Sequence, residues 1–211
     1  MNTKQRIERE ALRLFVEKGI AETSIRDISR AAGISQGAMY NHYASKDELA
    51  RTLFLRNFSE AASALEARAR AEEGVAAKLR GMVRYIYGRF DADAVVVAYL
   101  FLARQQYLSV LPEGFPHPYE PFRRVVNEAM ERGEIPPGND HVATSMIVGA
   151  IIQLIDTKVI EERRRGEGPI QGKLIDHADE VAAACARLLG AKAAAQTEAV
   201  ARTVVGANAQ V

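Results

Sequence analysis

The first proline in the chain is Pro112, so no proline interrupts helix formation across the residues that precede it. Apolar residues recur at helical spacing through almost every segment. The only cluster of β-branched residues, Val95 to Val97, lies among residues with the same helical spacing, and strand signals are nearly absent. The sequence therefore predicts an all-α protein of about nine helices.

Composition narrows the possible functions. The 211 residues include 48% hydrophobic and 26% charged residues, which is enough apolar surface for a packed core. The 28 basic and 27 acidic residues exclude a chain that is basic throughout, although a local basic face remains possible. A single cysteine and four histidines without ligand spacing argue against a metal site. Without a catalytic motif such as HExxH or GxSxG, we expect no catalytic residues, no cofactor and no enzymatic activity.

No segment of the sequence predicts export or membrane insertion. The start, MNTKQRIERE, is charged and lacks the apolar stretch of a secretory signal. The longest apolar run, residues 146–155, is about half the roughly 20 residues that a membrane span needs. We expect a cytoplasmic protein with no membrane partner.

Helix start and stop signals near the N-terminus divide the first residues into short helices. They predict a helix over residues 3–18, a second from Ser24 to Ala32 and a third from Ser35 to Tyr43. Gly33 and Ile34 form the tight turn between the second and third helices, and Ser45 begins a fourth. Two short helices joined by such a turn form a helix-turn-helix, whose second helix can enter the major groove of DNA.

The third helix has one apolar side and one polar side. Met39 and Tyr43 are four residues apart and apolar, so they should face the first two helices. The rest of the helix then points outward or to the flanks, and it carries no acid that would repel phosphate. These residues are Gln36, Gly37, Ala38, Tyr40, Asn41 and His42.

The chemistry of these side chains suits DNA. Gln36 and Asn41 can bond to adenine through two hydrogen bonds, Gly37 permits close backbone approach, and Ala38 can touch a thymine methyl group. Phosphate oxygens suit the hydroxyls and cations near the helix starts and on the helix flank. The candidate phosphate-binding residues are Ser24, Ser35, Tyr40, His42 and Lys46.

Residues 3–54 resemble the DNA-binding domain of the TetR family of bacterial transcriptional regulators. The resemblance rests on LF…KG, TSIRDIS, AGIS, QGAMYNHY and SKDEL, which follow one another without a gap. It implies base contacts from Arg26, Gln36, Ala38 and Asn41 and phosphate contacts from the residues named above. Gln36 stands where lysine is commoner in the family, and Met39 where leucine or another aliphatic residue is commoner.

The resemblance implies that the remaining helices form a ligand-binding and dimerisation domain. We expect a DNA-binding domain over residues 1–47, a helical effector-binding and dimerisation domain over 48–190, and an Ala-rich tail, prone to fraying, over 191–211. Helices are predicted at 46–71, 75–90, 93–111, 119–133, 140–165 and 173–190. The last two are apolar enough to pair with their copies in a homodimer, or to pack inside one subunit.

Aromatic residues in the middle helices, with polar residues among them, are typical of a small-molecule pocket, although aromatic residues at helical spacing also build plain cores. Gln153 is the best polar candidate, because it interrupts the most apolar segment and needs a partner if buried. The predicted ligand-binding residues are Tyr85, Phe101, Arg104, Gln105, Phe122, Asn127, Gln153 and Asp156.

Taken together, the sequence predicts a TetR-type regulator, a repressor that a small-molecule effector releases from a palindromic, double-stranded DNA operator. Two alternatives remain open. One is a helical small-molecule-binding protein that no longer binds DNA, and the other is an enzyme that uses the aromatic cavity, with Asp156 as its modest candidate acid.

Overall fold

The computed structural model describes residues 1–163 and 172–191, and within these ranges every regular element is a helix. The predicted fold class is confirmed. The α-helices are α1 (Thr3–Lys18), α2 (Ile25–Ala31), α3 (Gln36–Tyr40), α4 (Lys46–Arg70), α5 (Val75–Ala92), α6 (Ala94–Leu108), α7 (Tyr119–Glu131), α8 (Asp140–Arg163) and α9 (Ala178–Leu188). The single 3-10 turn η1 (Leu174–His177) precedes α9.

Local capping explains where the N-terminal helices begin. Ser24 caps α2 in a capping box, in which its side chain accepts from Asp27 N and Asp27 accepts from the Ser24 backbone. Ser45 Oγ likewise accepts from Glu48 N at 3.0 Å, whereas the Glu48 carboxylate accepts from Ala44 N instead of closing the box. Gly33, with φ of 65°, forms the turn after α2, because a left-handed backbone favours glycine.

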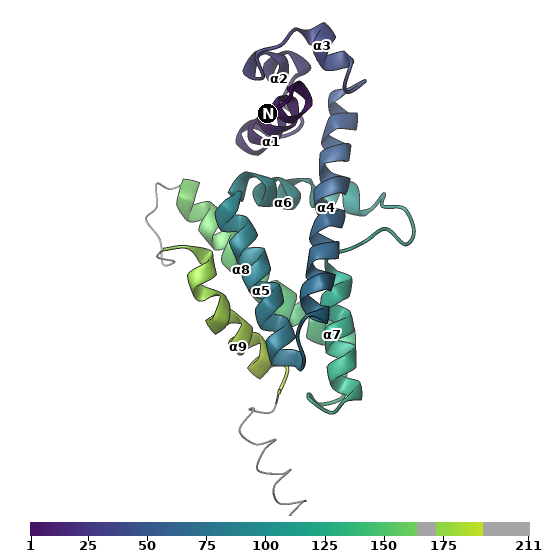
Figure 1. The fold of residues 1–211 in the computed structure, drawn as a ribbon, viewed down its shortest axis with the longest axis vertical. Helices are drawn as coiled ribbons and strands as arrows, with labels where there is room; N and C mark the ends of the chain where they lie inside the picture. The colour runs from purple at the N-terminus through teal and green to yellow at the C-terminus, as the bar shows by residue number, and fades with distance from the viewer. Residues whose placement is uncertain (164–171, 192–211) are drawn as a thin grey trace, which may run out of the picture.

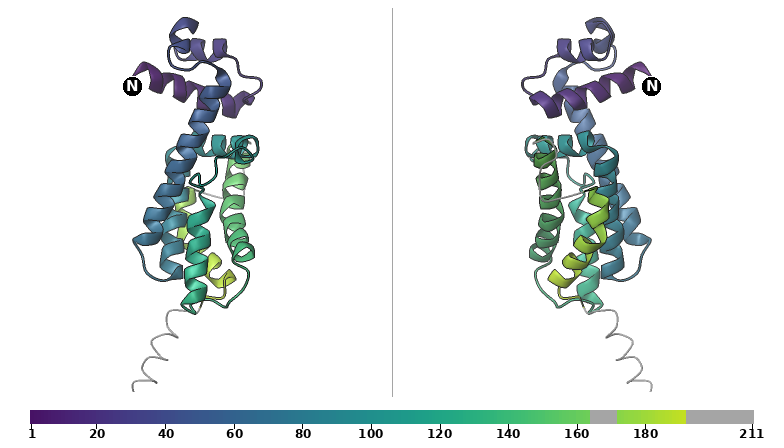
Figure 2. Two further views of the ribbon diagram at one scale, coloured as in Figure 1. Left: turned by 90° about the vertical axis from the view of Figure 1, so that its right-hand side faces the viewer. Right: turned by 90° about the vertical axis from the view of Figure 1, so that its left-hand side faces the viewer.

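The helices form two packed groups joined by α4 (Figure 1). Helices α1 to α3 lie at one end, and the C-terminal helices form a bundle at the other. Helix α4 runs from the first group into the second, so its Leu49 packs in the N-terminal core and its Leu65 in the core of the bundle. Within the bundle, α5 lies between α4 and α9 (Figures 1 and 2).

Helix α6 lies across the top of the bundle, beneath α1 (Figure 1). Its Tyr99 is fully buried in the N-terminal core, where its ring stacks on Phe15 at 5.7 Å and its hydroxyl donates to Ala50 O at 2.6 Å. Asp93, which caps α6, also pairs with Arg9 of α1 at 2.8 Å. The N-terminal core is therefore closed by a helix of the C-terminal region.

Several predicted boundaries shift in the structure. The third helix was predicted to extend to Tyr43 but ends at Tyr40, and Asn41 and His42 form a turn in which His42 N donates to Met39 O. The last predicted helix begins as η1, whose first amides are capped by Asp91. The predicted end of the 140–165 helix and the tail from residue 192 lie outside the described residues.

Candidate nucleic-acid interface and cavity

Helix α3 is held in place by its buried side and its cap. Ser35 Oγ accepts from Ala38 N at 3.1 Å, and the predicted inward residues are confirmed, with Met39 0% and Tyr43 4% exposed. Tyr43 donates its hydroxyl to Glu8 Oε1 at 2.6 Å, and Arg56 donates to both oxygens of the same carboxylate. One buried acid thus connects α1, the segment between α3 and α4, and α4.

The outer side of α3 is free of protein contacts that would cover it. Tyr40 is 54% exposed, and Ala38 is half-buried. The other predicted DNA-contacting residues of α2 and α3 and their caps are all exposed, namely Ser24, Arg26, Ser35, Gln36, Gly37, Asn41 and His42. The described α3 carries no acid, so the surface can approach phosphate and base edges without repulsion.

Besides Ser35, whose hydroxyl caps α3, two of the predicted phosphate-binding residues already have protein partners. Lys46 is half-buried, and its Nζ donates to Ala21 O at 3.0 Å. Ser24 Oγ donates to Asp27 Oδ2 at 2.6 Å. The hydrogen bonds from Ser24 lower the pKa of Asp27, which stays ionised beside Ser24. Their contacts with phosphate remain predictions, as do the base contacts of the neighbouring residues.

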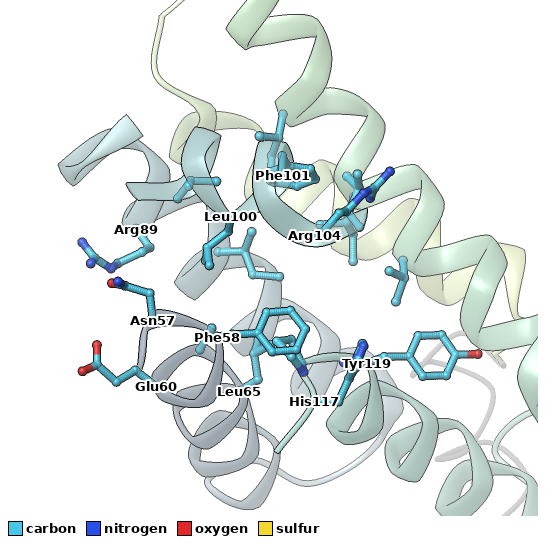
Figure 3. Close-up of a pocket in the computed structure, with 18 of the residues that line it drawn as sticks. Asn57, Phe58, Glu60, Leu65, Arg89, Leu100, Phe101, Arg104, His117 and Tyr119 are labelled. Carbon is cyan, nitrogen blue, oxygen red and sulfur yellow. Dashed lines mark hydrogen bonds between the residues drawn. The ribbon is translucent and has the colours of Figure 1, made fainter. Parts of the chain in front are cut away.

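An apolar cavity of about 250 Å³ lies in the bundle between α4, α5, α6, α7 and α8 (Figure 3). Aliphatic and aromatic residues form most of its wall, including Phe58, Leu100 and Ile151. Figure 3 shows polar side chains from α4 and α5 at one end and Arg104 of α6 at the other. A concave, mostly apolar space with a few polar groups has the character of a small-molecule site.

The structure brings half of the predicted pocket residues to this cavity. Those that line it are Tyr85, Phe101, Arg104 and Phe122, and those that do not are Gln105, Asn127, Gln153 and Asp156.

Helix rotation separates the second group from the cavity. Gln105 is one residue past Arg104, which turns it by about 100° toward solvent. Asn127 faces the start of α8, where its Nδ2 donates to Asp140 Oδ2 at 3.3 Å.

Gln153 corrects one inference from sequence. The sequence makes it the best polar candidate for the pocket, but its side chain is exposed on α8 and does not line the cavity. Ile151, Ile152 and Ile155 face the cavity, so Gln153 points to the other side of the same helix. Asp156 lies just past Ile155, and it too is absent from the wall of the cavity.

Sequence reasoning missed His117, which lines the cavity from the loop after α6. Its Nδ1 accepts from Tyr119 N at 3.0 Å, and Phe58 packs edge-on against its ring at 4.9 Å. Burial lowers the pKa of His117, so the imidazole is neutral at pH 7 and its remaining hydrogen lies on Nε2. The only signal in the sequence was a histidine inside a proline-rich loop, which is too common to assign.

The outer face of α8 is apolar and uncovered. Val142 is 57%, Met146 47% and Ile160 51% exposed, and Gly149 and Ala150 on the same helix are also exposed. Residues 140–161 are long and apolar enough to cross a membrane by composition, but one such helix is weak grounds for a membrane protein. Among the described residues, no cluster of three acids, histidines or cysteines could hold a metal ion.

Comparison with known proteins agrees with this geometry. The model of the bacterial regulatory proteins of the tetR family matches residues 7–53. The transcriptional repressor KstR2 of Mycobacterium tuberculosis is 46% identical over 48 residues, which cover 23% of this chain and 24% of that protein. For a second curated relative, a regulator from Bacillus subtilis, the matched part is 16% of its length.

Solved structures extend the likeness to the whole fold. The TetR-family regulator PfmR of Thermus thermophilus has a TM-score of 0.65 at 22% identity, over 89% of this chain and 99% of that one. FadR of Bacillus subtilis, solved with stearoyl-CoA, has a TM-score of 0.65 at 16% identity, over 86% and 96%.

Fold and surface together define a helix-turn-helix protein in which the helix-turn-helix unit is carried on a helical bundle with a cavity. The likeness to the tetR family of bacterial regulatory proteins lies in residues 7–53. The KstR2 match covers 48 residues, whereas the structural neighbours share the arrangement of helices over most of the chain.

Proposed function

We propose that the protein is a DNA-binding transcriptional repressor that a small-molecule effector releases from a palindromic operator. The observation that carries the proposal is the exposed, acid-free side of α3, held rigidly on a buried base beside a bundle that contains a cavity. The matched curated relative is itself a repressor. The protein acts on DNA in the cytoplasm and is not an enzyme in this proposal.

Recognition in this proposal depends on hydrogen bonding more than on charge. Gln36 and Asn41 read adenine edges, Arg26 reads guanine, and Ala38 meets a thymine methyl group. Gln36 carries no charge. The salt-dependent part of the affinity therefore comes from the phosphate contacts, which are made by the helix N-termini and by Tyr40, His42 and Lys46.

The proposed working unit is a homodimer formed through α8 and α9. The exposed apolar stripe on α8 includes Val142, Met146 and Ile160, and a row of exposed apolar residues on one helix is typical of a protein–protein contact. Exposed Gly149 and Ala150 allow a second helix to approach closely. Twofold symmetry would place the two α3 helices in successive major grooves, about 34–36 Å apart or at a multiple of that spacing.

Variant Met146→Glu tests the dimer. It places a charge within the apolar stripe. We expect the molecular mass from sedimentation equilibrium to fall from twice 23.2 kDa toward 23.2 kDa. Leu102→Glu is the matched control, because Leu102 is similarly exposed, at 49%, but belongs to a different helix, α6. Wild-type protein that sediments as a monomer at micromolar concentration would contradict the proposed dimer.

Selection of bound duplexes from random DNA tests the regulator itself. We expect the selected sequences to share two inverted half-sites, and a gel shift to show binding that variant Arg26→Ala weakens. If no sequence is enriched and no duplex is shifted at low salt, the alternative of a ligand-binding protein without DNA activity replaces this proposal.

A further inference from the structure

The cavity has an uneven distribution of charge. Among the described residues that line it, the charged ones are Glu60, Arg89 and Arg104. Figure 3 shows Glu60 and Arg89 at the same end, with Asn57 between them, while Arg104 lies at the opposite end beside Phe101. An anion at the first end would meet the carboxylate of Glu60, whereas no acid lines the second end.

Arg104 is placed to receive an anion. Its guanidinium lies 5.7 Å from the centre of the Phe101 ring, which orients the group, and it forms no ion pair with any described residue. A guanidinium presents two parallel donors that match the two oxygens of a carboxylate. The open part of Arg104 is therefore suited to bind a carboxylate at the mouth of the cavity.

The middle of the cavity suits hydrocarbon. Val97 and Leu100 of α6, Ile151 and Ile155 of α8 and Phe122 of α7 all line it. His117 also lines the cavity, and it carries no charge at pH 7 because burial lowers its pKa. A ligand that fits this pattern has an apolar body in the middle and its charge at one end.

We propose that the cavity binds an elongated apolar carboxylate, with its hydrocarbon between α6 and α8 and its carboxylate on Arg104. The volume of about 250 Å³ favours a chain of moderate length over a large polycyclic molecule. This inference rests on the proposed function in one respect, which is that the ligand acts as the effector. Binding of the ligand to the cavity can be measured without DNA.

Titration calorimetry on the full chain, with decanoate and decanol below their aggregation limits, tests the head group. Arg104→Gln should weaken decanoate binding about tenfold and decanol binding less than twofold, because only the carboxylate uses the guanidinium. Arg80→Gln is the matched control, since Arg80 is exposed on α5 outside the cavity and should leave both affinities unchanged.

Three results would overturn the inference. They are no binding of decanoate to the wild type, an equal loss for both ligands in Arg104→Gln, and a loss in Arg89→Gln with Arg104→Gln unaffected. A gel shift on the selected operator keeps the two proposals apart. Operator binding without decanoate binding leaves the regulator standing and removes this ligand class. Decanoate binding that depends on Arg104, with no DNA binding, keeps this ligand class and removes the proposed regulator.

Discussion

The buried carboxylate of Glu8 offers the sharpest test of how α3 is held. Variant Glu8→Gln keeps the shape and one acceptor for Tyr43, but it removes the charge that Arg56 pairs with. Hydrogen bonds to a charged group contribute about 1.5–3 kcal/mol to stability. Losing the bonds from Arg56 should cost an amount in the lower part of this range, because the Arg56 side chain is 40% exposed and can bond to water instead. We expect the free energy of unfolding to fall by about 2 kcal/mol.

Glu17→Gln is the control on the same helix. Glu17 pairs with Arg13 at 2.7 Å, but its side chain is 50% exposed, so its removal should cost about 0.3 kcal/mol. Urea denaturation followed by circular dichroism, at one fixed protein concentration, measures both variants. If Glu8→Gln falls within about 0.5 kcal/mol of Glu17→Gln, the buried network does not hold α3 as argued here.

The pH dependence of the same variant gives an independent check. Burial by itself raises the pKa of Glu8, but the hydrogen bonds from Arg56 and Tyr43 and the nearby cations lower it below its ordinary value of 4.5. The unfolded chain therefore takes up this proton before the folded chain does as the pH falls. The stability that Glu8 adds is complete above pH 4.5 and is lost below it, so wild type and Glu8→Gln should converge in acid.

Three further predictions concern DNA and the contact between the two helix groups. Gln36→Ala or Asn41→Ala should relax the preference at one base pair, at a cost of about 1–3 kcal/mol, in titrations with single-base operator variants. Lys46→Ala should weaken binding to all DNA sequences alike and reduce the slope of log K against log salt concentration by about one. An unchanged slope would mean that Lys46 does not contact phosphate. Asp93→Asn removes the ion pair with Arg9, so deuterium exchange at the start of α6 should rise. Unchanged exchange would mean that the pair does not stabilise the start of α6.

The N-terminal helices could be predicted from sequence because their signals are local. Ser24, Ser35 and Ser45 are caps that act within three residues, and Met39 faces inward because of its spacing from Tyr43. Such signals do not depend on what packs against the helix.

The wall of the cavity depends on how each helix is rotated against its neighbours, which composition does not reveal. Gln153 shows this most clearly. In the sequence it interrupts an apolar run and suggests a buried polar group, but α8 is apolar on two sides and only one faces the cavity. The second apolar side, around Met146, makes the run look fully buried although half of it is open in the single chain.

Helix α6 explains how the two proposed sites can influence each other. Its Val97 and Leu100 line the cavity, while its Tyr99 and Ala103 are buried in the N-terminal core. If a ligand in the cavity changed the tilt of α6, the N-terminal core that packs on the other side of α6 would have to move with it. Such a ligand shifts the equilibrium only by the difference between its affinities for the two positions of α6. By linkage, operator DNA must then weaken ligand binding by the same factor by which the ligand weakens DNA binding.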